Sequence, residues 1–354
     1  MNLKQVIDEL IEEKGLDKTV LESLVKQSME SAYLKKYPHV TFAIHYDHNS
    51  GRLSIDSIKQ VTQTVDDPDQ QVSLKKARFL NKDVHVGDMV KLPFEGLIGR
   101  VEVMHARQLL AQKIKMVEAA AIFHEFKDRK GDIIHGTLHK SQRGGYVVTL
   151  DEGTSAFLPL SHINPLDKIV IGATIRCLLF EVSQEPIGEY QLILDRASSD
   201  FVKKLMELEI PEVFENIVHV KKVVRIAGYK SKVVVFSQDD NIDSVGTCVG
   251  IGGSRIKPIL NELGGEKIDI IAFSDSLEQF IKESLKPARI DKVELIDNEN
   301  ACVWVDDDQR SYAIGKGGQN IALASKLVGI NIQINNKENH IQEKSVDEKL
   351  SDGW

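Results

Sequence analysis

Two copies of a short glycine-rich stretch constrain this chain more than any other feature of its sequence. The copies span residues 248–256 and 313–321, and in each an aliphatic residue precedes Gly-x-Gly-Gly, which a polar pair and an isoleucine follow. Each copy continues into an apolar stretch with helical spacing and then a short strand of alternating residues. In the first copy these are 259–263 and 267–270, and in the second they are 323–328 and 332–334. Because the similarity extends through loop, helix and strand, we expect an internal repeat of one folded unit.

The glycines of each copy have a physical use next to a chain of phosphates. Glycine lacks a Cβ atom, so it permits a strained turn and lets a sugar-phosphate backbone approach closely. A helix that follows offers free N–H groups and the positive end of its dipole. A Gly-x-x-Gly turn between two short helices is how a KH domain clamps about four nucleotides of single-stranded nucleic acid. The candidate RNA-binding residues of the two loops are Gly250, Ile251, Gly252, Gly253, Ser254, Arg255, Lys257, Gly315, Lys316, Gly317, Gly318, Gln319 and Asn320.

Two other phosphate-binding loops do not fit this spacing. A Walker A loop needs Ser or Thr directly after Gly-Lys, whereas Lys316 is followed by Gly317. A dinucleotide-binding fingerprint needs Gly-x-Gly-x-x-Gly directly after a strand. The residues ahead of the two loops, 244–249 and 310–314, instead have the character of a short helix. We therefore exclude both classes of nucleotide-binding site.

The charge of the chain limits how it could bind nucleic acid. The formal net charge is −8, although phosphate binding usually needs a basic face. Positive charge gathers in a predicted hairpin at 219–236, whose candidate RNA contacts are Lys221, Lys222, Arg225, Lys230 and Lys232. Either an acidic part and a local basic stripe are segregated, or RNA binding is weak and depends on a partner that holds RNA nearby.

Five short strands with closely spaced turn residues follow residue 130. They are expected at 131–138, 144–150, 156–160, 174–182 and 191–196. This spacing is typical of a small closed barrel, of which the OB-fold is the five-stranded type. Tyr146 and Phe157 could stack on bases, with Arg143 and Arg196 near the RNA backbone. Strand alternation leaves open the alternative that Phe157 belongs to the core and that only Tyr146 is exposed.

The first part of the chain mixes helical and strand patterns. Apolar residues at helical spacing predict helices at 3–11, 20–33 and 101–126, with Asp17 as the N-cap of the second. Alternating residues predict strands at 40–46, 53–58 and 84–91, of which the first two form a hairpin with a turn at 49–52.

No part of the sequence combines residues into a catalytic or metal-binding group. Cys177, Cys248 and Cys302 lie far apart and the histidines are scattered, so we expect no enzyme activity, no metal and no cofactor. No run is long enough to span a membrane, and the first residues lack a signal-peptide pattern. These features suit a protein of the reducing cytoplasm.

Longer stretches resemble the NusA family of bacterial transcription elongation and termination factors. These stretches are 5–16, 31–37, 207–213, 245–250, 261–270 and 313–320. The predicted barrel is similar to the RNA-binding barrel repeated in ribosomal protein S1. The resemblance covers residues 1–335 and implies an α+β multidomain chain: an N-terminal α+β domain, a five-stranded S1-like OB-type barrel and two tandem type II KH domains. The loops depart from the family at Ile251-Gly252 and at Ala322, where a basic residue is usual.

The resemblance also implies a division of the chain and a set of partners. The expected parts are an N-terminal RNA-polymerase-binding domain at 1–128, the barrel at 129–197, KH domains at 198–275 and 276–336, and a disordered polar tail at 337–354. The short linker after the barrel implies that barrel and KH domains form one rigid arm. Expected partners are core RNA polymerase, nascent single-stranded RNA and other antitermination factors, for a monomeric cytoplasmic protein that modulates pausing, termination and antitermination.

Charged residues near the start of the chain are candidates for the polymerase contact. The acidic ones are Asp8, Glu9, Glu12, Glu13 and Glu22. A basic set could serve equally, and such charges also suit a solvated helix face.

Two other functions use the same modules. A ribosome-biogenesis or translation-associated RNA-binding protein would carry them without binding polymerase. A phosphorolytic exoribonuclease would carry them beside a catalytic core, but the region ahead of the predicted barrel is too short for such a core and lacks its phosphate-site motifs.

Overall fold

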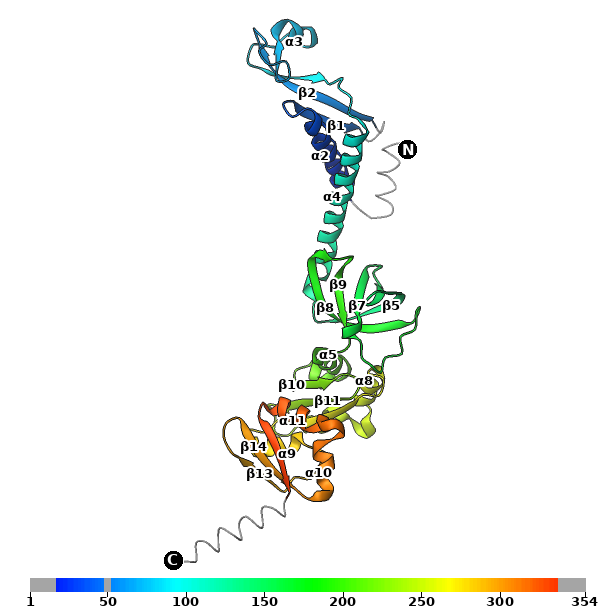
Figure 1. The fold of residues 1–354 in the computed structure, drawn as a ribbon, viewed down its shortest axis with the longest axis vertical. Helices are drawn as coiled ribbons and strands as arrows, with labels where there is room; N and C mark the ends of the chain where they lie inside the picture. The colour runs from blue at the N-terminus through cyan, green and yellow to red at the C-terminus, as the bar shows by residue number, and fades with distance from the viewer. Residues whose placement is uncertain (1–16, 48–51, 337–354) are drawn as a thin grey trace, which may run out of the picture. The chain divides into compact units, whose positions relative to one another are not determined.

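The computed structural model describes residues 17–47 and 52–336, and its contacts divide the chain into two units, 1–121 and 122–354. The helix predicted at 3–11, most of the turn predicted at 49–52 and the polar tail at 337–354 lie outside the described residues. Figure 1 colours the chain from blue to red along the sequence.

The first unit combines helices with a four-stranded sheet. Its elements are α2 (Lys18–Lys36), β1 (Thr41–Asp47), β2 (Arg52–Thr62), β3 (Gln71–Ser73), α3 (Leu74–Leu80), β4 (Met89–Pro93) and α4 (Arg100–Phe126). The sheet order is β1-β2-β3, with β4 paired to β2. Helix α2 packs on the sheet through Tyr33, which contacts Phe42 and Phe94 edge to face. The predicted cap is confirmed, because Asp17 Oδ1 accepts a hydrogen bond of 2.7 Å from Thr19 N.

Two features of the first unit differ from the prediction. The strand predicted at 84–91 begins only at Met89, because the residues before it form a turn in which His85 N donates to Asp88 Oδ2 and Gly87 has a φ of 102°. Helix α3 was not predicted. It buries a single residue, Ala77, so it carries no apolar stripe to indicate a helix.

The predicted five-stranded barrel is confirmed as a closed barrel of order β5-β6-β7-β9-β8. The strands are β5 (Ile133–Gln142), β6 (Gly145–Leu150), β7 (Ser155–Pro159), β8 (Thr174–Ile187) and β9 (Tyr190–Asp195), drawn in green in Figure 1. Leucines and valines of all five strands fill the interior, and Phe126 at the end of α4 joins them. Gly145 allows β6 and β7 to approach, because a Cβ atom there would lie 2.3 Å from the Leu158 carbonyl oxygen.

Two similar units follow the barrel, and in each two strands, two helices and a last strand follow an opening helix; the first unit has a second short helix ahead of its strands. The first consists of α5 (Ser199–Glu209), α6 (Pro211–Phe214), β10 (Val218–Ile226), β11 (Lys230–Ser237), α7 (Ser244–Val249), α8 (Ile256–Glu262) and β12 (Lys267–Ala272). The second consists of α9 (Leu277–Ser284), β13 (Lys292–Leu295), β14 (Asn300–Val305), α10 (Asp307–Ile314), α11 (Gln319–Val328) and β15 (Asn331–Asn336).

The two sheets have the same topology. In each, the first two strands are antiparallel and the last strand pairs in parallel with the second. Apolar residues from both units form one cluster between them, in which Val224 and Val234 of the first meet Leu323 and Leu327 of the second. The barrel also packs against the first of these two units, here called the KH units, because Leu178 of β8 belongs to the core of the first KH unit. The predicted arm is therefore a set of domains in direct contact.

Candidate nucleic-acid interface

The two glycine-rich loops have the same backbone conformation. Gly250 and Gly315 both have a φ of 73°, with ψ of 165° and 174°. The third residues, Gly252 and Gly317, have φ of 61° and 62°, and the fourth glycines have φ of 78° and 75°. These left-handed values are unfavourable for residues with a Cβ atom. The internal repeat is thus a repeat of backbone geometry as well as of sequence.

The glycines of each loop serve different purposes. A Cβ atom on Gly315 would lie 2.6 Å from Asn320 Cβ, and one on Gly250 would lie 2.9 Å from Arg255 Cγ, so the first glycine of each loop lets two helices meet. By contrast, nothing lies within 4 Å of a Cβ atom built on Gly252 or Gly317. The tip of each loop is therefore open to an approaching chain.

Arg255 and Asn320 occupy equivalent positions in the repeat, and both side chains donate a hydrogen bond to the helix before the loop. Arg255 Nη1 donates to the Thr247 carbonyl oxygen at 2.7 Å. Asn320 Nδ2 donates to the Tyr312 carbonyl oxygen at 3.2 Å, and Thr247 and Tyr312 are themselves equivalent in the repeat. Each side chain thus ties the second helix to the end of the first. Asn320 is buried, so its side chain has a structural role and does not face solvent.

The basic residues of the hairpin β10–β11 are engaged within the protein. Arg225 forms a buried ion pair with Glu266, and Lys230 and Lys232 both contact Asp269 Oδ2, at 2.8 and 2.9 Å. The charges of these three residues are thus paired within the protein, and the structure offers RNA no free cation at these positions. Burial also lowers the pKa of the Lys232 ammonium, against the opposing effect of Asp269.

The other two lysines of the hairpin are exposed, but they also make internal contacts. Lys222 Nζ donates to the carbonyl oxygens of Lys326 and Leu327 at the end of α11, which joins the two KH units. Lys221 Nζ lies 3.0 Å from the centre of the Phe273 ring. The positive charge of the hairpin serves mainly to hold strands and domains together.

Arg196, predicted to lie near RNA, is instead buried between the barrel and the first KH unit. Its guanidinium donates to both oxygens of Asp167 at 2.7 Å and to Glu262 Oε1 at 2.7 Å. Arg176 pairs with Glu262 from the other side, at 2.8 Å. Arg196 therefore joins the barrel to the first KH unit, and its guanidinium is fully engaged within the protein.

The barrel aromatics divide between its two faces. Phe157 lies outside the barrel core and stacks on Tyr190, with ring centres 5.4 Å apart and planes 11° apart. Tyr146 is half-buried and packs against the core cluster. This arrangement contradicts the alternative in which Phe157 is a core residue and Tyr146 alone is exposed. Arg143 is exposed in the β5–β6 turn.

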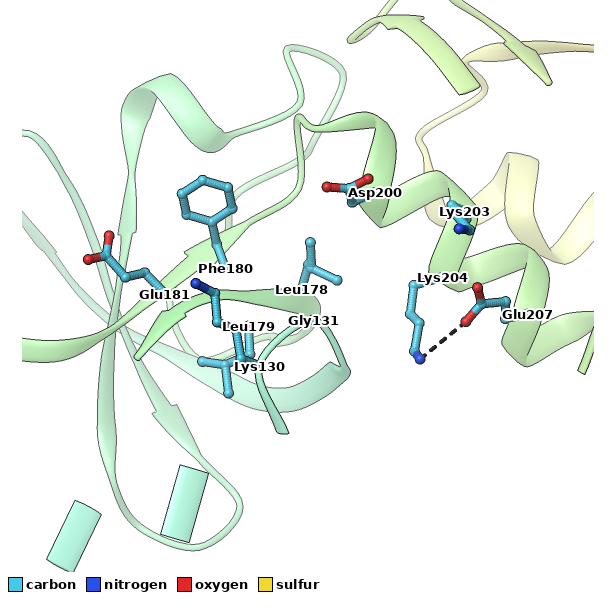
Figure 2. A pocket seen from close by; sticks show the side chains of 10 residues that line it. All are labelled: Lys130, Gly131, Leu178, Leu179, Phe180, Glu181, Asp200, Lys203, Lys204 and Glu207. Carbon is cyan, nitrogen blue, oxygen red and sulfur yellow. Dashed lines mark ion pairs between the residues drawn. The ribbon is translucent and has the colours of Figure 1, made fainter. Parts of the chain in front are cut away.

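A groove of about 600 Å³ lies between β8 of the barrel and α5 of the first KH unit (Figure 2). Phe180 on the barrel wall is exposed and contacts the His162 ring, with centres 5.2 Å apart. Lys203 and Lys204 line the opposite wall, and Lys204 pairs with Glu207 and with Asp132 of the barrel. The sequence carries no signal for Phe180, since only the folded barrel brings it beside α5.

Other kinds of site find no support in the described part of the chain. Residues 17–47 and 52–336 contain no group of three or more His, Cys, Asp or Glu side chains that could hold a metal ion. Among the helices of these ranges, none combines the length and the apolar character that a membrane crossing requires.

The sequence of this chain is similar to those of known proteins of one family. Models of the NusA N-terminal domain, the NusA-like first KH domain and the NusA-like second KH domain match residues 2–120, 196–273 and 277–342. The transcription termination/antitermination protein NusA of Thermus thermophilus is 34% identical over 350 residues, which cover 94% of this chain and 89% of that protein. The chain belongs to the NusA family.

Further NusA proteins agree with this membership. The NusA protein of Rickettsia prowazekii is 36% identical over 360 residues, covering 98% of this chain and 69% of that protein. The NusA protein of Bacillus subtilis is 32% identical over 328 residues, covering 92% and 88%. Both are named transcription termination/antitermination proteins. The family predicted from the sequence is confirmed, as is the assignment to RNA-binding transcription factors rather than enzymes. The ribosomal alternative finds no support.

Proposed function

We propose that this NusA-family chain binds core RNA polymerase through its first unit and nascent single-stranded RNA through its KH units. By holding RNA at the polymerase it would modulate pausing, termination and antitermination. The observation that carries the proposal is the pair of loops with one backbone geometry and open tips. A Gly-x-x-Gly turn between two helices is the element by which KH domains clamp single strands.

The proposed RNA-binding set is smaller than the set predicted from sequence. It retains the loop residues except Asn320, with Arg255 in a supporting role. The exposed cations Lys257 and Lys316 are the proposed phosphate contacts. On the barrel, the stacked pair Phe157 and Tyr190 offers an aromatic surface on which bases could stack, next to Arg143.

We propose the division into 1–128, 129–197, 198–275 and 276–336, and a monomer that acts in the cytoplasm with other antitermination factors. Of the acidic candidates for the polymerase contact, Glu22 lies half-buried on α2, and the other four lie outside the described residues.

Gel filtration with core RNA polymerase tests the proposed partner. The full chain and a chain lacking residues 1–121 are each mixed with bacterial core enzyme and fractionated. We expect the full chain to co-elute with the polymerase and the shortened chain to elute alone. Elution of the folded full chain apart from the polymerase would refute the proposed partner, and co-sedimentation with ribosomes would then favour a ribosomal role.

A further inference from the structure

The internal repeat allows the two loops to be compared position by position. Ile251 at the tip of the first loop corresponds to Lys316 at the tip of the second. Four residues beyond the last glycine of each loop the lysine is in the other copy, because Lys257 of the first copy corresponds to Ala322 of the second. Each copy therefore carries one lysine near its loop, but at a different place.

The two lysines are the available cations of their loops. Both are exposed, and neither has an ion-pair partner among residues 17–47 and 52–336. Arg255, the other cation of the first loop, is paired with Glu212 at 2.6 Å. The Lys257 side chain lies along Gly253, since a Cβ atom built there would be 3.5 Å from Lys257 Cε. Lys257 thus belongs to α8 and its side chain reaches back to the last glycine of the first loop, whereas Lys316 stands at the tip of the second loop.

Ile251 is the most exposed large apolar residue of the first loop, with 97% of its surface accessible. Burying such a side chain against a ligand is favourable, because apolar surface is removed from water. The isoleucine side chain has no donor for a phosphate, but it can pack against the sugar or base of a nucleotide. The backbone geometry is the same in both loops, so the difference lies in side-chain chemistry alone.

We propose that the two KH loops hold RNA by different contacts. In the first loop Ile251 packs against sugar or base while Lys257 binds a phosphate across Gly253, and in the second loop Lys316 binds a phosphate at the tip. The inference rests on the proposed RNA binding and adds which residue of each loop supplies charge and which supplies apolar contact.

The test measures the affinity of the full chain for a mixed pool of labelled single-stranded RNA across a range of salt concentrations. Each phosphate contact on a single strand contributes about −0.7 to the slope of log affinity against log salt. We expect Lys257→Ala and Lys316→Ile each to make the slope shallower by about 0.7. Ile251→Ala should lower the affinity about three- to tenfold, as for loss of one partly buried aliphatic side chain, at unchanged slope.

A double variant exchanges the pattern of one loop for that of the other. Ile251→Lys with Lys257→Ala gives the first loop the charges of the second, so the slope should return to that of the unaltered chain while the Ile251 contact is lost. Ile296→Ala and Lys75→Ala are matched controls, since both residues are exposed and lie outside the loops. We expect these two variants to bind as the unaltered chain does.

The outcomes separate this inference from the proposed function. One outcome is that the unaltered chain binds RNA while Ile251→Ala leaves the affinity unchanged or the lysine variants leave the slopes unchanged. That result would overturn the proposal that the two loops use different contacts, and it would leave the proposed RNA binding intact. Absence of RNA binding by the folded, unaltered chain at low salt would overturn both. Because the substituted side chains are exposed, loss of folding does not explain a changed slope.

Discussion

Arg225 and Glu266 form an ion pair of 2.9 Å whose side chains are 1% and 0% exposed. Arg225 Nη1 also donates to the carbonyl oxygens of Arg196 and Ser198, where the barrel meets α5. Glu266 accepts further hydrogen bonds from Gly228 N and Ser231 Oγ. The pair therefore connects three segments of the arm: the hairpin β10–β11, the start of β12 and the linker from the barrel.

Replacing one member of this pair should destabilise the arm strongly. Arg225→Met leaves the Glu266 carboxylate buried without its cation, a situation that typically costs about 3–5 kcal/mol. Urea unfolding followed by circular dichroism measures the change. Arg129→Met is the matched control, because the Arg129–Glu152 pair is more than a third exposed and such pairs contribute about 0–1 kcal/mol. Equal effects of the two substitutions would contradict the structural role of the Arg225 pair.

The buried Lys232 ammonium predicts a pH dependence of stability. Burial lowers the Lys232 pKa in the folded chain below its ordinary value of 10.5. At pH values between this lowered pKa and 10.5, the unfolded chain therefore binds more protons than the folded chain. Stability therefore rises with pH across this window, and the penalty for burying the charge is fully present at neutral pH. Relative to Lys232→Met, the unaltered chain should gain stability from neutral pH to a pH near 10.5. A relative loss over this range would show that Asp269 outweighs burial.

Gly145 and Gly144 are adjacent glycines that should differ in their tolerance of alanine. At Gly145 a Cβ atom would lie 2.3 Å from the Leu158 carbonyl oxygen, so Gly145→Ala should separate β6 from β7 and lower the thermal midpoint sharply. At Gly144, where φ is 88°, nothing lies within 4 Å, and only backbone strain of about 1 kcal/mol is expected. Scanning calorimetry distinguishes the two variants. A larger loss for Gly144→Ala would refute the close approach of β6 and β7.

The sequence predicted the folds of the domains but not the use of their charges. The repeat, the barrel and the KH topology follow from local spacing of glycines and apolar residues, which a single chain displays directly. The ion-pair partners of Lys232 and Arg196 are instead residues distant in sequence. Lys232 is opposite Asp269 only because β11 and β12 are parallel in that register, and Arg196 meets Glu262 only where barrel and α8 touch. Strand patterns cannot reveal such pairs, so the sequence alone does not distinguish a paired lysine from one that is free to contact RNA.

In the N-terminal unit, a short helix could not be predicted from the sequence. Helix α3 has Ser73 as its N-cap, but one buried residue gives no periodic signal. Its position is set by packing of Ala77 against Val61, Val72 and Val84, residues that only the folded sheet assembles. Long stripes such as that of α4 are readable from sequence, whereas short helices fixed by tertiary contacts are not.

The most direct test of the whole account is single-round transcription on a template with an RNA-hairpin terminator. Purified polymerase is supplied with the unaltered chain, with Lys316→Asp/Gly317→Asp, or with a chain lacking residues 1–121. The double substitution places negative charge at an exposed loop tip where a Cβ atom meets nothing, at the cost of about 1 kcal/mol of backbone strain at Gly317, where φ is 62°. It should therefore weaken RNA binding without unfolding the domain. We expect the unaltered chain to change the fraction of terminated transcripts and both altered chains to lose most of that effect. A full effect from either altered chain would contradict a factor that acts by joining polymerase to RNA.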